Sequence, residues 1–311
     1  MAEMQTVWTW LPAIYLFLAG LSAGTFLAIA VLRFWKPGRF RKTGTIGAWA
    51  AVVLLAVGLL CLVAETEKPL QAMILFTSFV NFGSWMTIGA WLLLATFIEW
   101  LVYAVVTTPR LADEKVGEGV KKALAIVGAV LAVCVALYAA VLLLSAPAMA
   151  LWNTMLLPVL FLVSAIDTGL ALVVIILAVG PDRADAHELM PWIEKGVCVM
   201  VVLELVVLVA FVVMAGSGSN VAAAFSADQL VNGALAVPFW LLVIVVGLGA
   251  PLVTALTSTI SKKEAKPTMS VAGAVCALVG GFTLRYVILA AGATAAMIAP
   301  TLFGAALGVP L

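Results

Sequence analysis

Four ionisable side chains interrupt the long apolar runs of this 311-residue sequence, namely Asp167, Glu204, Arg285 and Glu99. A charged group at membrane depth costs several kcal/mol and tends to mark a proton path or a ligand pocket. One interpretation is therefore a proton path through these four residues. The alternative is a structural ion pair between Arg285 and one of the acids, with Glu99 extending its carboxylate to the membrane surface.

A second group of polar and aromatic residues falls near the opposite set of predicted helix ends. Its members are Tyr15, Glu65, Glu67, Ser84, Trp85, Tyr138, Trp152 and Asn153. A quinone needs hydrogen-bond donors for its carbonyl groups and a proton carrier for its reduction, so phenol, amide and carboxylate groups collected at one face suit a quinone. For Trp8, Trp10 and Trp152 the alternative is a belt of aromatic side chains that anchors helices at the membrane surface.

Membrane-spanning helices must position both groups. Hydrophobic residues make up 65% of the sequence and charged residues 10%, whereas soluble domains have about 25% charged residues. A spanning helix needs about 20 mostly apolar residues, and these runs are apolar on all sides, unlike the alternating strands of a membrane barrel. The sequence thus predicts an all-α integral membrane protein with eight helices, over residues 8–32, 43–64, 72–106, 121–145, 155–179, 194–215, 233–259 and 270–298, and a short interfacial helix near 226–230.

Basic residues gather in alternate connections between these helices. Fourteen of the 16 Lys and Arg residues lie in or beside the odd-numbered connections: Arg33, Lys36, Arg39, Arg41, Lys42, Arg110, Lys115, Lys121, Lys122, Arg183, Lys195, Lys262, Lys263 and Lys266. The positive-inside rule places these connections in the cytoplasm. Both termini are then expected outside, and the first helix lacks the basic flank of a cleaved secretory signal.

Cysteine and histidine usage argues against a metal-based electron carrier in this protein. Cys61, Cys134, Cys198 and Cys276 lie singly in four different predicted helices, without the paired spacing of an iron-sulfur or zinc site. The single histidine, His187, lies in a predicted loop, so no axial imidazole for haem is available within the membrane. We therefore expect no haem and no iron-sulfur cluster here, and the sequence has no basic patch for nucleic acid.

Six motifs in order along the sequence together resemble the NrfD/PsrC family, the membrane subunits of polysulfide reductase and related molybdenum oxidoreductase complexes. They are YLFLAGLSAGT from Tyr15, AETEKP from Ala64, SWMTIGAW from Ser84, Tyr138, LWN from Leu151 with Pro158 and Ser164, and GGFTLR ending at Arg285. The resemblance covers nearly the whole sequence and has the same helix count.

The resemblance implies a single transmembrane domain over residues 1–311, with two four-helix bundles, in a bacterial or archaeal cytoplasmic membrane. It further implies menaquinone or ubiquinone near the outer surface, next to a ferredoxin-like [4Fe-4S] subunit and a molybdopterin catalytic subunit. Tyr138 matches a quinone-contacting tyrosine and Glu65 matches the acid after the second helix. Tyr15 stands where the polysulfide reductase prototype has a histidine. Because a phenol is a poor base near pH 7, proton handling is expected to fall to Glu65 or Glu67.

The predicted function is a membrane anchor that exchanges electrons between quinol and an iron-sulfur partner, with the terminal substrate bound by another subunit. Either direction of electron flow is compatible with the residues, and the protons either leave at the outer face or connect to the cytoplasm through the buried charges. Two alternatives remain open. Buried acids and an arginine are also usual in secondary transporters of a small solute or ion, and a purely structural anchor would share the same fold.

Overall fold

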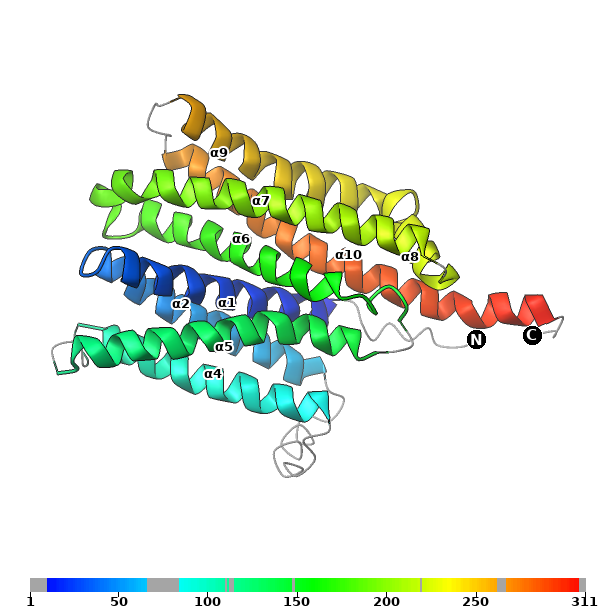
Figure 1. Ribbon diagram of the computed structural model, residues 1–311, viewed down its shortest axis with the longest axis horizontal. Coiled ribbons are helices and arrows are strands. Elements are labelled where there is room, and N and C mark those ends of the chain that lie inside the picture. The colour runs from blue at the N-terminus through cyan, green and yellow to red at the C-terminus, as the bar shows by residue number, and fades with distance from the viewer. Residues whose placement is uncertain are drawn as a thin grey trace.

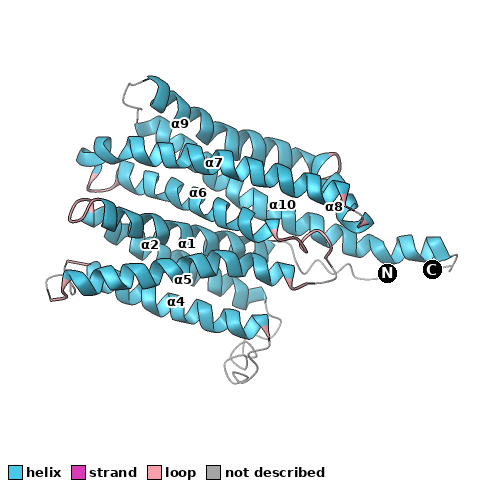
Figure 2. Cartoon of the chain, in the orientation of Figure 1, coloured by secondary structure: helices cyan, strands magenta, loops and turns pink. Residues whose placement is uncertain are grey.

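The computed structural model describes residues 10–65, 84–109, 111, 115–146, 149–218, 220–261 and 267–307, and the side chains of residues 65, 258–261, 267 and 294–307 are outside the description. Within these ranges the protein consists of helices and loops, without a β-strand (Figure 2). In the described part of the chain, eight helices are long and apolar enough to cross a membrane. The prediction of an all-α protein with eight spanning helices is therefore confirmed.

The helices form two bundles of four. The first bundle contains α1 (Trp10–Trp35), α2 (Arg41–Glu65), α4 (Trp85–Thr107) and α5 (Glu118–Leu144). The second contains α6 (Leu156–Val179), α7 (Ala186–Ser217), the continuous pair η2 (Pro238–Gly249) and α9 (Ala250–Ser261), and α10 (Pro267–Leu307). Helix α1 also contacts α6 and α10, and so joins the bundles side by side (Figure 1). The short elements η1 (Arg183–Asp185) and α8 (Val221–Val231) lie in connections, and α8 matches the predicted short helix.

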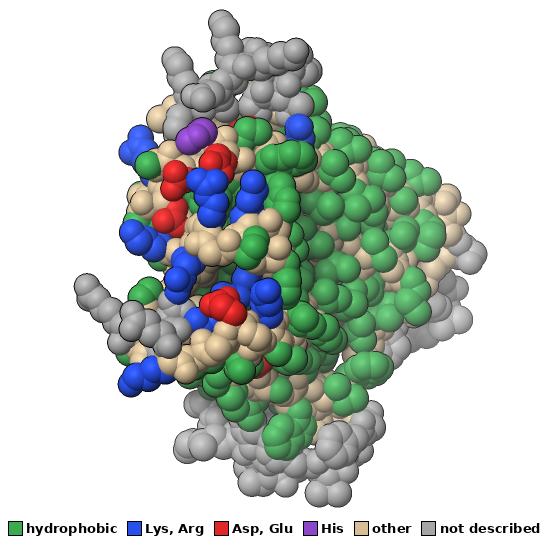
Figure 3. Space-filling model, turned by 60° about the vertical axis from the view of Figure 1, so that its left-hand side comes forward, with side chains coloured by type: hydrophobic (Ala, Val, Ile, Leu, Met, Phe, Trp, Pro, Cys, Tyr) green, Lys and Arg blue, Asp and Glu red, His purple; other side chains and the backbone are tan. Residues whose placement is uncertain are grey.

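The connections α1–α2, α4–α5 and α6–α7 lie at the same end of the molecule (Figure 1). Lys and Arg side chains gather over this end, whereas the neighbouring flank is covered by hydrophobic side chains (Figure 3). We call it the basic end, and the other the opposite end. Helix α10 continues beyond the other helices at the opposite end. The structure thus separates the charged connections from an apolar belt, as expected of a protein held in a bilayer.

Glycines permit the closest helix crossings. On α1 and α6, Gly24 and Gly169 meet so closely that a Cβ atom on either would overlap the backbone of the other helix. On η2 and α10, Gly247 and Gly280 meet in the same way. Small residues let membrane helices approach this closely because attraction between them comes largely from packing rather than from the exclusion of water. The first of these crossings lies between the two bundles.

Several helix boundaries differ from the sequence prediction: α4 begins at Trp85 rather than at residue 72, and α10 ends at Leu307 rather than at residue 298. Helix α7 begins at Ala186 rather than at residue 194, because Leu189, Met190 and Ile193 are buried there and stabilise extra turns; the charged residues and Pro191 in that stretch concealed this apolar face. The predicted 233–259 helix is split into η2, which has π-helical geometry, and α9. The backbone N–H of Ala250 accordingly donates to the carbonyl of Val245, five residues earlier.

Contacts at the basic end fix the α1–α2 loop against the second bundle. Asp182, from the α6–α7 connection, accepts hydrogen bonds from the backbone N–H of Thr43 at 2.8 Å and from the Thr43 hydroxyl at 2.9 Å. Its carboxylate therefore caps the first turn of α2. Arg39 also forms an ion pair of 2.7 Å with Glu188 on α7. The two bundles are thus joined by their loops as well as by α1.

We expect Asp182→Ala to lower the free energy of unfolding by about 1–2 kcal/mol, because the fully buried Thr43 would lose its cap and its hydroxyl partner. Chemical denaturation of the purified protein in detergent measures this loss. Asp185→Ala is the matched control, because the exposed Asp185 makes no capping hydrogen bond with its side chain. Equal losses in the two variants would show that the cap contributes nothing specific.

Candidate functional site

Tyr138 of α5 reaches across the first bundle to the start of α4. Its hydroxyl group donates a hydrogen bond to the backbone carbonyl of Trp85 at 3.2 Å, and the side chain is only 8% exposed. Gly89, one turn further along α4, leaves the space that the phenol ring occupies, since a Cβ atom there would overlap the ring and its hydroxyl group. The local sequence of α4 therefore determines where the phenol oxygen lies.

Tyr15 brings the remaining two helices of the bundle to the same place. It lies on α1, is 2% exposed, and contacts α2 at Gly58, where a Cβ atom would lie 3.7 Å from the Tyr15 ring. The Tyr15 and Tyr138 phenols are close enough to interact electrostatically. We call the two tyrosines with Gly58, Trp85 and Gly89 the tyrosine cluster. It unites α1, α2, α4 and α5 in the half of the bundle nearer the opposite end.

The other predicted quinone residues are only partly connected with this cluster. Ser84 precedes α4 and makes no capping hydrogen bond with its side chain, and Trp85 is about half exposed. Trp152 is buried in the α5–α6 connection, where its indole N–H donates to the backbone carbonyl of Ile288 on α10 at 3.0 Å. Asn153, next to it, is exposed. These positions place Trp152 against the second bundle.

The predicted acids after the second helix are largely outside the described residues. Glu65 is the last residue of α2, so its backbone is placed two turns beyond Gly58, but its side chain is not described. Glu67 is outside the described residues altogether. Their role in proton handling stays a prediction.

A second site lies inside the second bundle, around Arg285 of α10. The guanidinium group is fully buried, and its Nη1 donates to the Ser164 hydroxyl at 3.1 Å and to the Gly281 carbonyl at 2.8 Å. The rings of Phe161 and Phe17 lie 5.4 Å and 5.8 Å from the guanidinium carbon. Such distances are typical of cation–π contacts, which partly offset the loss of water around a buried cation.

Asp167 and Glu204 complete this site, which we call the buried ionic cluster together with Ser164 and Arg285. Both acids are buried and interact electrostatically with each other, and Glu204 also interacts with Arg285 and with the Ser164 hydroxyl. Among the described residues no carboxylate oxygen lies within 4.0 Å of the guanidinium group. The ion pair of the alternative interpretation is therefore not direct, and Ser164 lies between Arg285 and Glu204.

Several polar atoms of the buried ionic cluster have no hydrogen-bond partner in the described structure. They are Oδ1 of Asp167 and Nε and Nη2 of Arg285. The space between the acids, Thr168 and the η2–α10 crossing is too small for a water molecule. Buried polar groups left without partners are costly, so a change in protonation or a small helix movement would alter the energy of this site strongly.

Glu99 lies apart from the buried ionic cluster, within the first bundle. Both of its carboxylate oxygens are buried without a hydrogen-bond partner in the described part of the protein, and a Cβ atom at Gly128 of α5 would lie 2.5 Å from one of them. Phe26 and Trp100 stack beside it with ring centroids 4.8 Å apart. The carboxylate therefore does not extend to the membrane surface as the alternative interpretation supposed.

Sequence reasoning missed the residues that make room for these sites. Gly58 and Gly89 face the tyrosines, and Gly281 and Gly20 face the guanidinium group. Gly89 and Gly281 do occur inside the motifs SWMTIGAW and GGFTLR, which was the available signal. Across the described ranges no group of three or more His, Cys, Asp or Glu residues could hold a metal ion, and the four cysteines are free thiols.

Comparison with known families decides which class of membrane protein has this arrangement. Residues 1–297 match the family model described as polysulphide reductase, NrfD. The chain belongs to the NrfD family. It is accordingly a multi-pass membrane protein, and the family assigned from its motifs is confirmed.

Curated relatives align with nearly the whole length of this NrfD-family protein. It is 32% identical over 306 residues to the C subunit of polysulfide reductase from Wolinella succinogenes, an alignment that covers 93% of this protein and 95% of that subunit. It is 30% identical to protein NrfD of Escherichia coli, with 92% and 95% coverage. It is 28% identical to the NrfD homologue of Haemophilus influenzae, with 92% and 94% coverage.

Proposed function

We propose that this protein is the quinone-binding membrane subunit of a multi-subunit respiratory oxidoreductase. In this role it anchors the complex and passes electrons between membrane quinol and an iron-sulfur partner. The observation that carries the proposal is the tyrosine cluster, in which two phenols from α1 and α5 meet between four helices. The two phenols are buried hydrogen-bond donors, and glycines on the neighbouring helices leave space for their rings. Such donors suit the oxygens of a quinone, which is flat and mostly apolar.

The chemistry of the tyrosine cluster follows from its donors. The substrate, menaquinol or ubiquinol, supplies two electrons and two protons on oxidation. Tyr138 would exchange its hydrogen bond to the Trp85 carbonyl for one to a substrate oxygen, and Tyr15, held against α2, would donate to the other. Neither phenol is a good proton acceptor near pH 7. We assign proton acceptance to Glu65, at the end of α2, with Glu67 as the second acid.

The buried charges suit a proton path. Glu204, Asp167 and Arg285 lie together across three helices of the second bundle, and Glu99 lies in the first bundle, where its carboxylate has no hydrogen-bond partner among the described residues. Such groups are retained in membrane proteins chiefly where they bind or move ions. We infer that they connect quinone chemistry with the basic end, which the positive-inside rule assigns to the cytoplasm.

The partners follow from the same role. One relative is named as the C subunit of polysulfide reductase, a name that denotes one part of a larger reductase. For the present protein we propose a ferredoxin-like subunit with [4Fe-4S] clusters and a molybdopterin catalytic subunit, both at the opposite end, outside the cytoplasmic membrane. Co-purification with an iron-rich complex that contains molybdenum is the expected result, whereas a secondary transporter would be isolated alone.

Tyr138→Phe tests the quinone assignment. The variant keeps the ring but loses the donor, so quinol-dependent turnover of the intact complex should fall about tenfold or more, whereas turnover with a soluble artificial electron donor should stay unchanged. Tyr286→Phe is the matched control, because Tyr286 stacks on Trp10, with ring centroids 4.6 Å apart, through its ring rather than its hydroxyl. A similar loss with both donors would contradict the assignment.

A further inference from the structure

A cavity of about 400 Å³ opens at the basic end of the first bundle, between α1, α2, α4 and α5. Five of the side chains that line it are cationic: Arg33, Lys36, Arg39, Arg41 and Lys122. Among the described residues that line it, Glu118 is the one acidic residue. So many cations around one hollow repel one another, and an anion bound among them would relieve that repulsion.

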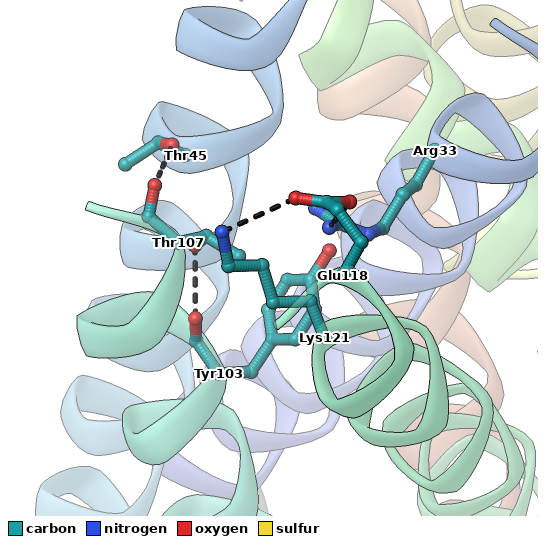
Figure 4. Close-up of polar contacts among 6 residues, drawn as sticks. All are labelled: Arg33, Thr45, Tyr103, Thr107, Glu118 and Lys121. Carbon is teal, nitrogen blue, oxygen red and sulfur yellow. Dashed lines mark hydrogen bonds and ion pairs between the residues drawn. The ribbon is translucent and has the colours of Figure 1, made fainter. Parts of the chain in front are cut away.

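The acids nearby neutralise only part of this charge. Glu118 forms ion pairs with Arg33 at 2.7 Å and with the buried Lys121 at 3.2 Å, and it lies between them in Figure 4. Glu188 pairs with Arg39. In the part of the protein that is described, no carboxylate lies within 4.0 Å of Lys36 or Lys122. Counted over the described residues, the cavity therefore keeps an excess of positive charge.

Arg33, which lines the cavity, also has an unused hydrogen-bond donor. Nε of Arg33 is buried and has no hydrogen-bond partner among the described residues, although the same guanidinium group contacts Glu118 and the Tyr103 hydroxyl. Tyr103 is itself held below this group on α4, where the hydroxyl of Thr107 donates to its carbonyl at 2.8 Å (Figure 4). A guanidinium held in this manner is well suited to a phosphate oxygen.

One part of the cavity wall, the α1–α2 loop, is held by specific contacts. In this loop Gly38 has φ +80° and the buried Phe40 has φ +54°, so the backbone turns sharply and inserts the Phe40 ring into the protein. The capping of Thr43 by Asp182 holds the same loop in place. The backbone that carries Lys36, Arg39 and Arg41 is therefore held in place before any ligand arrives, which lowers the entropy cost of binding.

We propose that this cavity binds the phosphate headgroup of an anionic phospholipid. A lipid is favoured over free phosphate because Leu32 also lines an apolar cleft of about 370 Å³ that α1 forms with α6 and α7. Trp35 and Trp192 line that cleft in an edge-to-face contact with centroids 5.3 Å apart, and Lys36 lies 5.9 Å from the Trp35 ring. An acyl chain that leaves the cavity past Leu32 meets this apolar surface.

Native mass spectrometry of the purified full-length protein tests this proposal, with phosphatidylglycerol and phosphatidylcholine added separately in detergent. The expected result is one tightly retained phosphatidylglycerol, and little phosphatidylcholine. The double variant Lys36→Gln/Lys122→Gln should raise the phosphatidylglycerol concentration for half occupancy at least tenfold. The matched control is Lys42→Gln/Lys115→Gln, which removes the same charge from exposed positions that do not line the cavity, and it should bind like the wild type.

Three results would overturn the proposal. If both double variants bound phosphatidylglycerol equally weakly, binding would depend only on the overall charge of the protein and not on the cavity. Equal retention of both lipids would mean that the phosphate headgroup charge is not recognised. Displacement of phosphatidylglycerol by 10 mM inorganic phosphate, a concentration on the order of that of weak phosphate sites, would identify a soluble anion as the occupant. The assay uses no quinone, so its outcome is independent of the function proposed above.

Discussion

Gly89→Ala should reduce quinol-dependent turnover at least as much as the loss of the Tyr138 hydroxyl group, by about tenfold or more. A Cβ atom at this position would overlap the Tyr138 ring and hydroxyl group. The ring is buried and cannot simply turn aside, so the phenol must leave its place beside the Trp85 carbonyl. The measurement is steady-state turnover of the assembled complex with quinol, compared with turnover from a soluble artificial donor.

The matched control for this variant is Gly119→Ala. Gly119 lies in the first turn of α5, and a Cβ atom there would meet nothing within 4 Å. It should therefore leave turnover unchanged and stabilise the helix slightly. If Gly89→Ala kept full turnover with quinol, the position of the Tyr138 phenol would be irrelevant to the reaction and the proposed site would be wrong.

The second large effect is expected on stability. Arg285→Leu should lower the free energy of unfolding by about 3 kcal/mol or more, because Glu204 would stay buried without the cation that interacts with it. Denaturation in mixed micelles, followed by circular dichroism, measures the change. Arg183→Leu is the control, because Arg183 is exposed in a connection and surface substitutions typically change stability by less than about 0.5 kcal/mol.

A double variant separates this electrostatic cause from lost packing. Arg285→Leu/Glu204→Gln should be more stable than Arg285→Leu alone, because the amide does not carry the charge that the missing guanidinium would offset. If the two variants were equally unstable, the loss would come from the volume and hydrogen bonds of the arginine side chain. The electrostatic interpretation of the buried ionic cluster would then fail.

The spanning helices were predictable because lipid exposure demands long uncharged runs, and most boundaries fell within a few residues of their predicted places. The prediction of helix boundaries and helix geometry failed where contacts with other helices determine the structure. The early start of α7 depends on the burial of Leu189 and Ile193 against neighbouring helices. The π-helical geometry of η2 occurs where Gly247 approaches Gly280, which is distant in the sequence. Neither contact has a signal in local composition.

The sequence indicated which individual residues belong to the candidate sites, but it did not indicate how these residues contact one another. Asp167, Glu204 and Arg285 stand out because charge is rare in apolar runs, yet only the fold shows that Ser164 lies between the arginine and Glu204. Tyr138 was identified through a motif, but its acceptor is a backbone carbonyl, which side-chain patterns do not indicate. Trp152 was predicted at the quinone, and only the fold shows that its indole N–H is hydrogen-bonded to α10.

The crossing of α1 and α6 constrains how the two bundles can move. Backbone touches backbone at Gly24 and Gly169, so sliding one helix along the other would force side chains of neighbouring turns into the contact. Rotation about the crossing avoids this overlap, although it would displace the contacts of Asp182 and Arg39 that join the bundles at the basic end. The crossing therefore lies between the two bundles, with the tyrosine cluster in the first and the buried ionic cluster in the second. Any rocking motion that accompanies turnover would have these glycines at its centre, where displacement is smallest.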